Sequence, residues 1–76
     1  MTNPRLILNE LKWKKEYDIK NAEIWYLHRG APNDTKIISG EEVVDIGRSF
    51  MKTHRASIPY HRVLKIIYNG KNMFLR

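Results

Sequence analysis

The sequence predicts a two-layer α+β domain in which two helices pack on a largely antiparallel sheet made of two hairpins. Three observations predict this fold class. Two segments have the residues of helix starts, several short runs are rich in β-branched and aromatic residues, and Asn69-Gly70 is typical of a tight hairpin turn. Their succession gives the order α-β-β-α-β-β, and the pattern leaves the strand order open.

The first helix is expected to begin directly after Asn3, whose side chain can cap it, with Pro4 in the first helical position. One side of this helix is apolar and consists of Leu6, Ile7, Leu8 and Leu11. We expect the helix to end near Lys12 or Trp13. Residues 14–21 are polar and predict a loop.

The first hairpin is predicted over residues 22–38. A nearly all-apolar strand, Ala22–Arg29, alternates between two faces. One face carries Ile24, Tyr26 and His28, and the other carries Trp25, Leu27 and Arg29. Residues 30–34 form a turn by composition, in which Gly30 supplies a positive φ. A short strand, Thr35–Ile38, completes the hairpin.

The second helix is predicted from Ser39-Gly40-Glu41-Glu42, which fits a capping box with Ser39 as the N-cap. The positions that follow have the i, i+3, i+4, i+7 spacing of a buried helix face. They are Val43, Ile46, Gly47 and Phe50, and we expect Gly47 to allow close approach of another element. Basic residues suit the C-terminal end of this helix; they are Lys52, His54 and Arg55.

The second hairpin is predicted from strands at Ser57–Tyr68 and Lys71–Arg76, joined by Asn69-Gly70 in a type I′ turn. The two-residue turn predicts three opposed pairs, Tyr68 with Lys71, Ile66 with Met73 and Leu64 with Leu75. Period-2 alternation adds Tyr60 and Arg62 to the face of these residues. Pro59 lacks an N–H donor and is expected on a sheet edge or at the start of the strand.

Length, charge and cysteine content limit the possible functions. The 76 residues form one domain, residues 1–76, and 14 Lys and Arg against 8 Asp and Glu give a net charge of +6. Such a domain attracts anions, of which nucleic acid is the commonest. The absence of Cys excludes disulfides and thiolate metal sites, and it favours a cytoplasmic location. We expect no metal, no cofactor and no membrane partner; the oligomeric state is not predicted.

Two short basic strings carry the functional hypothesis. His28-Arg29-Gly30 closes one apolar run, and Ile58-Pro59-Tyr60-His61-Arg62 opens another. Each string places an imidazole beside a guanidinium, whose planar fork of donors matches phosphate oxygens. Tyr60 is the aromatic residue we expect to be exposed for stacking on a base. We therefore predict one shallow phosphate-binding pocket formed by both strings.

The same strings carry a resemblance to a known family. Residues 26–32, the Ile38-Ser39-Gly40-Glu41 segment and residues 58–66 resemble a small archaeal family that defines the RNA cyclic group end recognition domain. In larger eukaryotic proteins that domain stands beside two-histidine phosphoesterase modules. The resemblance implies binding of RNA ends that carry a 2′,3′-cyclic or terminal phosphate. The matching positions are His28, Arg29, Gly30, Tyr60, His61 and Arg62.

Two other functions remain open at the sequence level. A small phosphoesterase or nuclease would use His28 and His61 as an acid–base pair, with a cation such as Lys65 or Arg29 beside the phosphate. We assign no catalytic residue and favour a binding role. Alternatively, the chain is a protein-interaction factor whose basic surface is incidental. If Arg29 and Arg62 have no binding role, we expect each to form an ion pair with Asp or Glu or to lie solvated on the surface.

Overall fold

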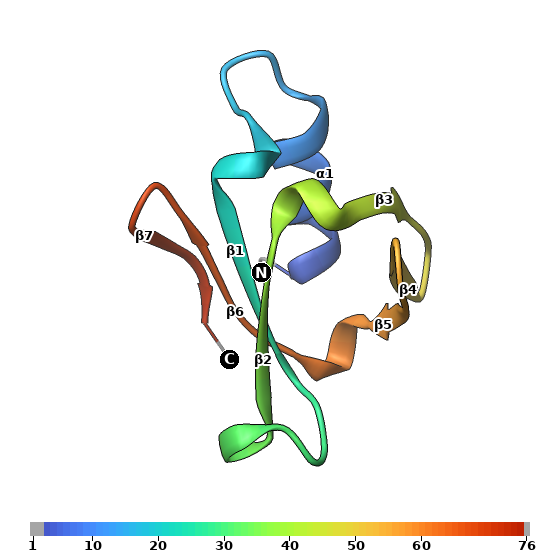
Figure 1. Cartoon of the computed structure of the whole chain (residues 1–76). Coiled ribbons are helices and arrows are strands. Elements are labelled where there is room, and N and C mark those ends of the chain that lie inside the picture. Colours follow the sequence, from blue (N-terminus) through green and yellow to red (C-terminus); the bar gives the residue numbers. More distant parts are fainter. Residues whose placement is uncertain (1–2, 76) are drawn as a thin grey trace.

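Two antiparallel sheets and one α-helix make up the fold in the computed structural model, which describes residues 3–75 (Figure 1). The fold is therefore α+β. The helix and strands are α1 (Pro4–Trp13), β1 (Ala22–Leu27), β2 (Thr35–Ser39), β3 (Val43–Ile46), β4 (Phe50–Thr53), β5 (Ser57–Pro59), β6 (Val63–Tyr68) and β7 (Lys71–Leu75). Single 3₁₀ turns cover Ile19–Asn21, Pro32–Asp34, Gly40–Glu42 and Tyr60–Arg62.

The four-stranded sheet has the order β2-β1-β6-β7, so the two predicted hairpins lie side by side through β1 and β6 (Figure 1). All pairs are antiparallel. The predicted turn at Asn69-Gly70 is confirmed, with positive φ at both residues, +50° and +80°. The final predicted strand residue, Arg76, lies outside the described residues.

The first helix is confirmed. The Asn3 side chain accepts a hydrogen bond from the Leu6 N–H at 2.9 Å, and Pro4 occupies the first helical position. The apolar stripe of α1 is buried except for Leu6, which is half exposed. The core lies between this helix and the inner faces of the strands, and its fully buried members are Leu8, Leu11, Ile24, Met51, Val63 and Ile66.

The prediction of a second helix is wrong. Ser39 does cap, because its hydroxyl accepts the Glu41 N–H, but it caps only the 3₁₀ turn Gly40–Glu42. The chain then forms β3 and β4, which pair with β5 in a separate three-stranded sheet. Phe50, expected on a buried helix face, is 39% exposed, and its neighbour Met51 is fully buried. The β-branched residues of 43–46 favour the extended conformation over a helix.

The predicted strand over Ser57–Tyr68 is broken in two. The 3₁₀ turn Tyr60–Arg62 separates β5, an edge of the small sheet, from β6 in the large one. Pro59 therefore ends an edge strand, as its missing donor requires. The predicted register is correct only for Tyr68 opposite Lys71. An irregularity between Ile66 and Ile67 places Ile66 opposite Phe74 instead of Met73, and Lys65 opposite Leu75.

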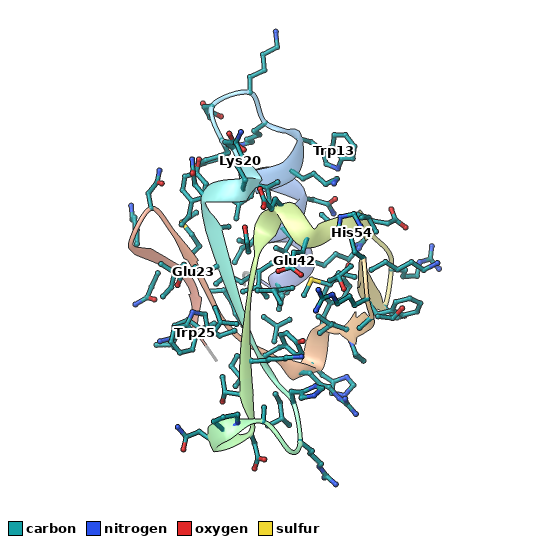
Figure 2. The ribbon with its side chains drawn as sticks, in the orientation of Figure 1. Trp13, Lys20, Glu23, Trp25, Glu42 and His54 are labelled. Carbon is teal, nitrogen blue, oxygen red and sulfur yellow. The ribbon has the colours of Figure 1, made fainter. Side chains whose placement is uncertain are left out.

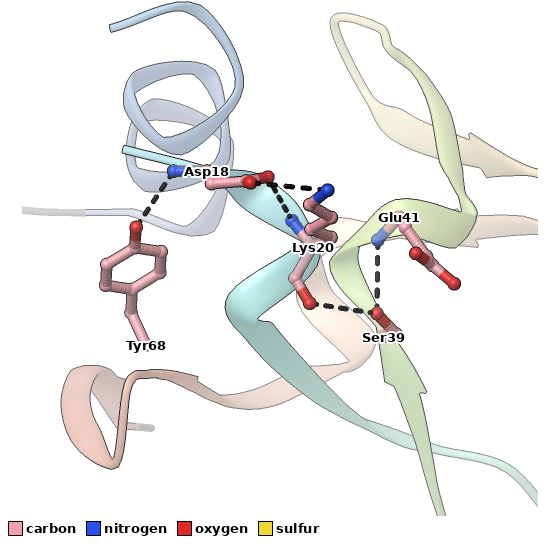
Figure 3. A network of polar contacts seen from close by, with 5 residues as sticks. All are labelled: Asp18, Lys20, Ser39, Glu41 and Tyr68. Atoms are coloured by element: carbon pink, nitrogen blue, oxygen red, sulfur yellow. Dashed lines mark hydrogen bonds and ion pairs between the residues drawn. The ribbon is translucent and has the colours of Figure 1, made fainter. Parts of the chain in front are cut away.

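One polar network ties the four-stranded sheet to the segment after α1 (Figure 3). The Tyr68 hydroxyl accepts the Asp18 N–H at 2.8 Å, and the Ser39 hydroxyl donates to the Lys20 carbonyl at 3.3 Å. Gly40 is buried directly against Ile19, and a Cβ at position 40 would overlap the Ile19 carbonyl oxygen. The loop predicted over residues 14–21 is thus fixed to the start of β3.

Candidate nucleic-acid interface

The largest pocket, about 500 Å³, lies between the two sheets, and we call it the cleft pocket. Its lining comes from β1 and the turn after it, from β2, and from the β4–β5 hairpin with the turn that follows β5. Its charged or titratable lining residues are His28, Lys36, Glu42, Arg55 and Arg62. Thr53 and Ser57 also line the pocket, but the Thr53 hydroxyl is used within the β4–β5 turn, where it donates to the Ala56 carbonyl at 3.1 Å. The pocket therefore combines three permanent cations with one carboxylate.

The turn after β1 positions the first basic string. Strand β1 ends at Leu27, two residues earlier than predicted, so His28 and Arg29 lie in the turn. The His28 N–H donates to the Asp34 carbonyl at 2.8 Å. Gly30 has the predicted positive φ of +93°, and its N–H donates to the Asp34 side chain at 3.4 Å. The Gly30 amide is therefore used within the turn.

Tyr60 anchors the second basic string. Its hydroxyl donates to the Gly47 carbonyl at 2.6 Å, and the Arg5 Nε donates to the same carbonyl at 3.2 Å. The Tyr60 ring is half-buried and packs against the core, so the expectation that it is exposed is wrong. Because Tyr60 fixes the 3₁₀ turn from inside, the exposed residues His61 and Arg62 follow at its outer side.

A second pocket of about 220 Å³, which we call the rim pocket, is lined by Leu27, Arg29, His61 and Arg62. Arg62 lines both pockets. The two histidines and two arginines of the basic strings are thus divided between the pockets: His28 lines the cleft pocket, Arg29 and His61 line the rim pocket, and Arg62 lies at their junction. Neither pocket is lined by both His28 and His61.

The arginines of the site form no ion pair with another described residue. Within residues 3–75, the single ion pair shorter than 4 Å joins Lys20 to Asp18, remote from the basic strings in the sequence. The ion-pair reading of Arg29 and Arg62 is thus excluded for the described part of the chain. Their guanidinium groups are exposed and can bind an external anion.

Tyr26 lies at the inner side of the cleft pocket. Its ring is 8% exposed and meets the His28 ring edge-on, with 6.1 Å between the ring centres. Burial raises the pKa of the Tyr26 phenol, and the negative charge of Glu42 raises it further. The phenol is therefore neutral at physiological pH and offers a hydroxyl to a ligand in the pocket.

The outer face of the large sheet carries a different surface. Lys65, considered above as a phosphate-binding cation, holds its ammonium 4.2 Å from the centre of the Trp25 ring. Figure 2 shows Trp25 on the opposite side of β1 from Glu42. A shallow groove of about 360 Å³ there is lined by Trp25, Ile37, Leu64, Lys65 and Leu75 among others. Lys65 lines neither basic pocket.

Sequence reasoning missed two cations of the cleft pocket. Lys36 pairs with Tyr26 across the β1–β2 hairpin, which puts it on the same face as His28. This placement follows from the predicted hairpin, once its register is worked out. Arg55 was assigned to a helix end; it lies instead in the β4–β5 turn, where the Thr53 hydroxyl accepts its N–H at 3.3 Å. No local signal places Arg55 beside β2.

Comparisons with known proteins identify the family of this chain. A family model described as the MJ1316 RNA cyclic group end recognition domain matches residues 1–76. The chain belongs to this family. Its relatives include the UPF0248 protein MmarC5_1387 of Methanococcus maripaludis strain C5, with 41% identity over 66 residues, covering 87% of this chain and 84% of the relative. A UPF0248 protein of Archaeoglobus fulgidus is 29% identical over 70 residues, covering 91% and 99%.

The family relationship extends over archaea of different genera. A UPF0248 protein of Pyrobaculum islandicum shares 30% identity over 66 residues, covering 82% of this chain and 74% of the relative. No solved structure matches the chain. Among residues 3–75, no cluster of three or more His, Asp or Glu side chains could hold a metal ion, and no helix is long and apolar enough to cross a membrane.

Proposed function

We propose that this domain binds the end of a single-stranded RNA that carries a 2′,3′-cyclic or terminal phosphate, with the phosphate in the cleft pocket. The observation that carries the proposal is the convergence of Lys36, Arg55 and Arg62 on one pocket in which the described residues form no ion pair. The description of the family names the same kind of ligand. Arg62 supplies the planar fork that suits two phosphate oxygens.

The size of the pocket favours an end over an internal segment. A volume of about 500 Å³ accommodates one nucleotide-sized group, and pockets of this class span roughly 300–1,000 Å³. The described part of the chain offers one α-helix, and α1 buries its apolar side against the core. This helix contributes no residue to the cleft pocket, so recognition there rests on the phosphate and the terminal ribose.

The same geometry argues for binding rather than hydrolysis. An acid–base pair of histidines must meet at one phosphate, in hydrogen-bond reach of the reacting atoms. His28 and His61 line different pockets. Incubation of the protein with an RNA ending in a cyclic phosphate tests this directly: we expect the ring to stay closed, and ring opening that depends on both histidines would establish an enzyme.

The proposal is tested by binding of matched oligonucleotides that end in a 2′,3′-cyclic phosphate, a 3′-phosphate or a 3′-hydroxyl. We expect the wild-type domain to bind the hydroxyl end most weakly. Arg62→Lys should lose about tenfold in affinity for the phosphate ends and little for the hydroxyl end, because a point charge cannot form the planar fork. Arg48→Lys is the matched control, since Arg48 is exposed in the β3–β4 turn and lines no pocket described above.

Salt dependence separates this function from protein interaction. Contact with several phosphates releases counterions, so the logarithm of the affinity should fall with the logarithm of the salt concentration by about 0.7 per phosphate contact. Equal affinity for all three ends, or no RNA binding at low ionic strength, would contradict the proposed function. The second outcome would favour a protein partner.

A further inference from the structure

One carboxylate lies among the cations of the cleft pocket. Glu42 ends the 3₁₀ turn Gly40–Glu42, is half-buried, and lines the pocket together with Lys36, Arg55 and Arg62. Figure 2 shows it near the centre of the view, between β2 and the small sheet. It belongs to no ion pair shorter than 4 Å within residues 3–75. Its charge is therefore not cancelled by a direct partner in the described structure.

The field of this carboxylate reaches the interior of the pocket. Tyr26, on the facing strand β1, lines the same pocket, and after burial the negative charge of Glu42 is the next cause of its raised phenol pKa. A phosphate bound in the pocket lies among the same lining residues, Glu42 and the cations included. Such a phosphate therefore meets the attraction of the cations and the repulsion of Glu42 together.

We propose that Glu42 makes the cleft pocket select phosphates that carry one negative charge over phosphates that carry two. This inference rests on the proposed function and names its specificity-determining residue. A 2′,3′-cyclic phosphate is a diester with a single charge, whereas a terminal phosphomonoester carries about 1.5 to 2 charges at pH 7. The selection is thus between a diester and a monoester, and ring shape is secondary.

The physical argument depends on how each energy scales with ligand charge. The attraction of the cations and the repulsion of Glu42 both rise in proportion to that charge, whereas the cost of removing the phosphate from water rises with its square. Glu42 offsets one of the three cations, so the second charge of a monoester gains less attraction while its desolvation cost stays high. A singly charged diester does not meet this penalty.

The first test uses Glu42→Gln, which removes the charge and keeps the size of the side chain. We expect its affinity for the 3′-phosphate end to rise by about tenfold relative to the cyclic end, the change that corresponds to 1.4 kcal/mol. Glu41→Gln is the matched control: it changes the net charge equally, but Glu41 is exposed and lines none of the pockets described above. Glu42→Asp should retain the wild-type ratio.

The second test uses the wild-type protein and changes the ligand. An RNA ending in a 3′-O-methyl phosphate is a linear diester with one charge, so it separates charge from ring shape. We expect it to bind within about twofold of the cyclic end and more tightly than the 3′-phosphate end. Binding as weak as that of the 3′-phosphate end would overturn the inference and assign the preference to the ring.

The outcomes distinguish this inference from the proposed function. If the wild-type domain binds no phosphate end at low salt, both fail. If the phosphate ends bind but Glu42→Gln and Glu41→Gln change the cyclic-to-linear ratio equally, the function stands and the role of Glu42 is wrong. If only Glu42→Gln changes the ratio, in favour of the 3′-phosphate, the inference is supported.

Discussion

At the scale of single residues, Arg62 connects the two halves of the candidate site. It lines both the cleft pocket and the rim pocket, and the turn that carries it is fixed through Tyr60 to the Gly47 carbonyl. The sequence identifies Arg62 as a candidate because it follows a His in a basic string. The sequence does not show that Tyr60 fixes this turn, because a Tyr beside Pro and His suits either a buried or an exposed position.

The pH dependence of stability tests the environment of Tyr26. Its phenol pKa is raised by burial and by Glu42, so the neutral form is favoured in the folded state. As the pH rises, the unfolded chain loses this proton first, near pH 10. The stabilisation is therefore complete below about pH 10 and is lost as the pH rises through the folded pKa. We expect Tyr26→Phe to lose less stability than wild type between pH 9 and 11.

Urea unfolding across this pH range measures the effect, and Tyr60→Phe is the comparison. The phenol pKa of Tyr60 is also raised, chiefly by burial, so this variant should show a smaller loss at high pH too. It should in addition be about 1 kcal/mol less stable at neutral pH, because it loses the hydrogen bond to Gly47. A Tyr26→Phe curve parallel to the wild-type curve throughout pH 9 to 11 would contradict the assigned environment.

At the scale of elements, residues 43–53 were predicted as a helix but form the strands β3 and β4, which shows that a local apolar pattern does not decide between the two. Ser39 does act as a cap, and Val43 is buried as predicted. A helical spacing of four apolar positions was also compatible with two short strands, since Ile46 and Phe50 lie near the β3–β4 turn. The deciding factor is strand pairing: β4 gains both β3 and β5 as partners, although each lies only a few residues away in the sequence.

Substitution of Gly40 tests whether the turn Ile19–Asn21 fixes the start of β3. We expect Gly40→Ala to lower the free energy of unfolding by about 2–3 kcal/mol, because the added methyl group overlaps a backbone oxygen that cannot move without the turn Ile19–Asn21. Glu41→Ala in the same turn is exposed and should cost less than about 0.5 kcal/mol.

Chemical denaturation of the two variants makes the comparison. Equal stability of Gly40→Ala and Glu41→Ala would show that the close approach of the two turns does not constrain the fold. The sequence identified Ser39 and Gly40 as a helix entry, but the requirement for glycine at position 40 arises from a contact across 21 positions of the chain. The local spacing of residue types does not predict such a contact.

At the scale of the whole molecule, the division into two sheets creates the candidate site. The hairpins β1–β2 and β6–β7 were predictable, because turn residues and alternation are local signals. The cleft pocket was not, because it requires Arg55 of the small sheet to face Lys36 of the large sheet. Two of the six predicted site residues, His28 and Arg62, line this pocket, and Arg29 and His61 line the rim pocket beside it.

The central claim is that the cleft pocket receives the terminal phosphate. Amide chemical-shift mapping tests it most directly, because a chain of 76 residues gives a fully assignable ¹⁵N–¹H spectrum. The titrant is a short RNA ending in a 2′,3′-cyclic phosphate, and the reference is the same RNA ending in a hydroxyl. We predict end-specific shifts at Lys36, at 55–58 and at Arg62, around the cleft pocket. End-specific shifts confined to Trp25, Leu64 and Leu75 on the outer face would contradict the account.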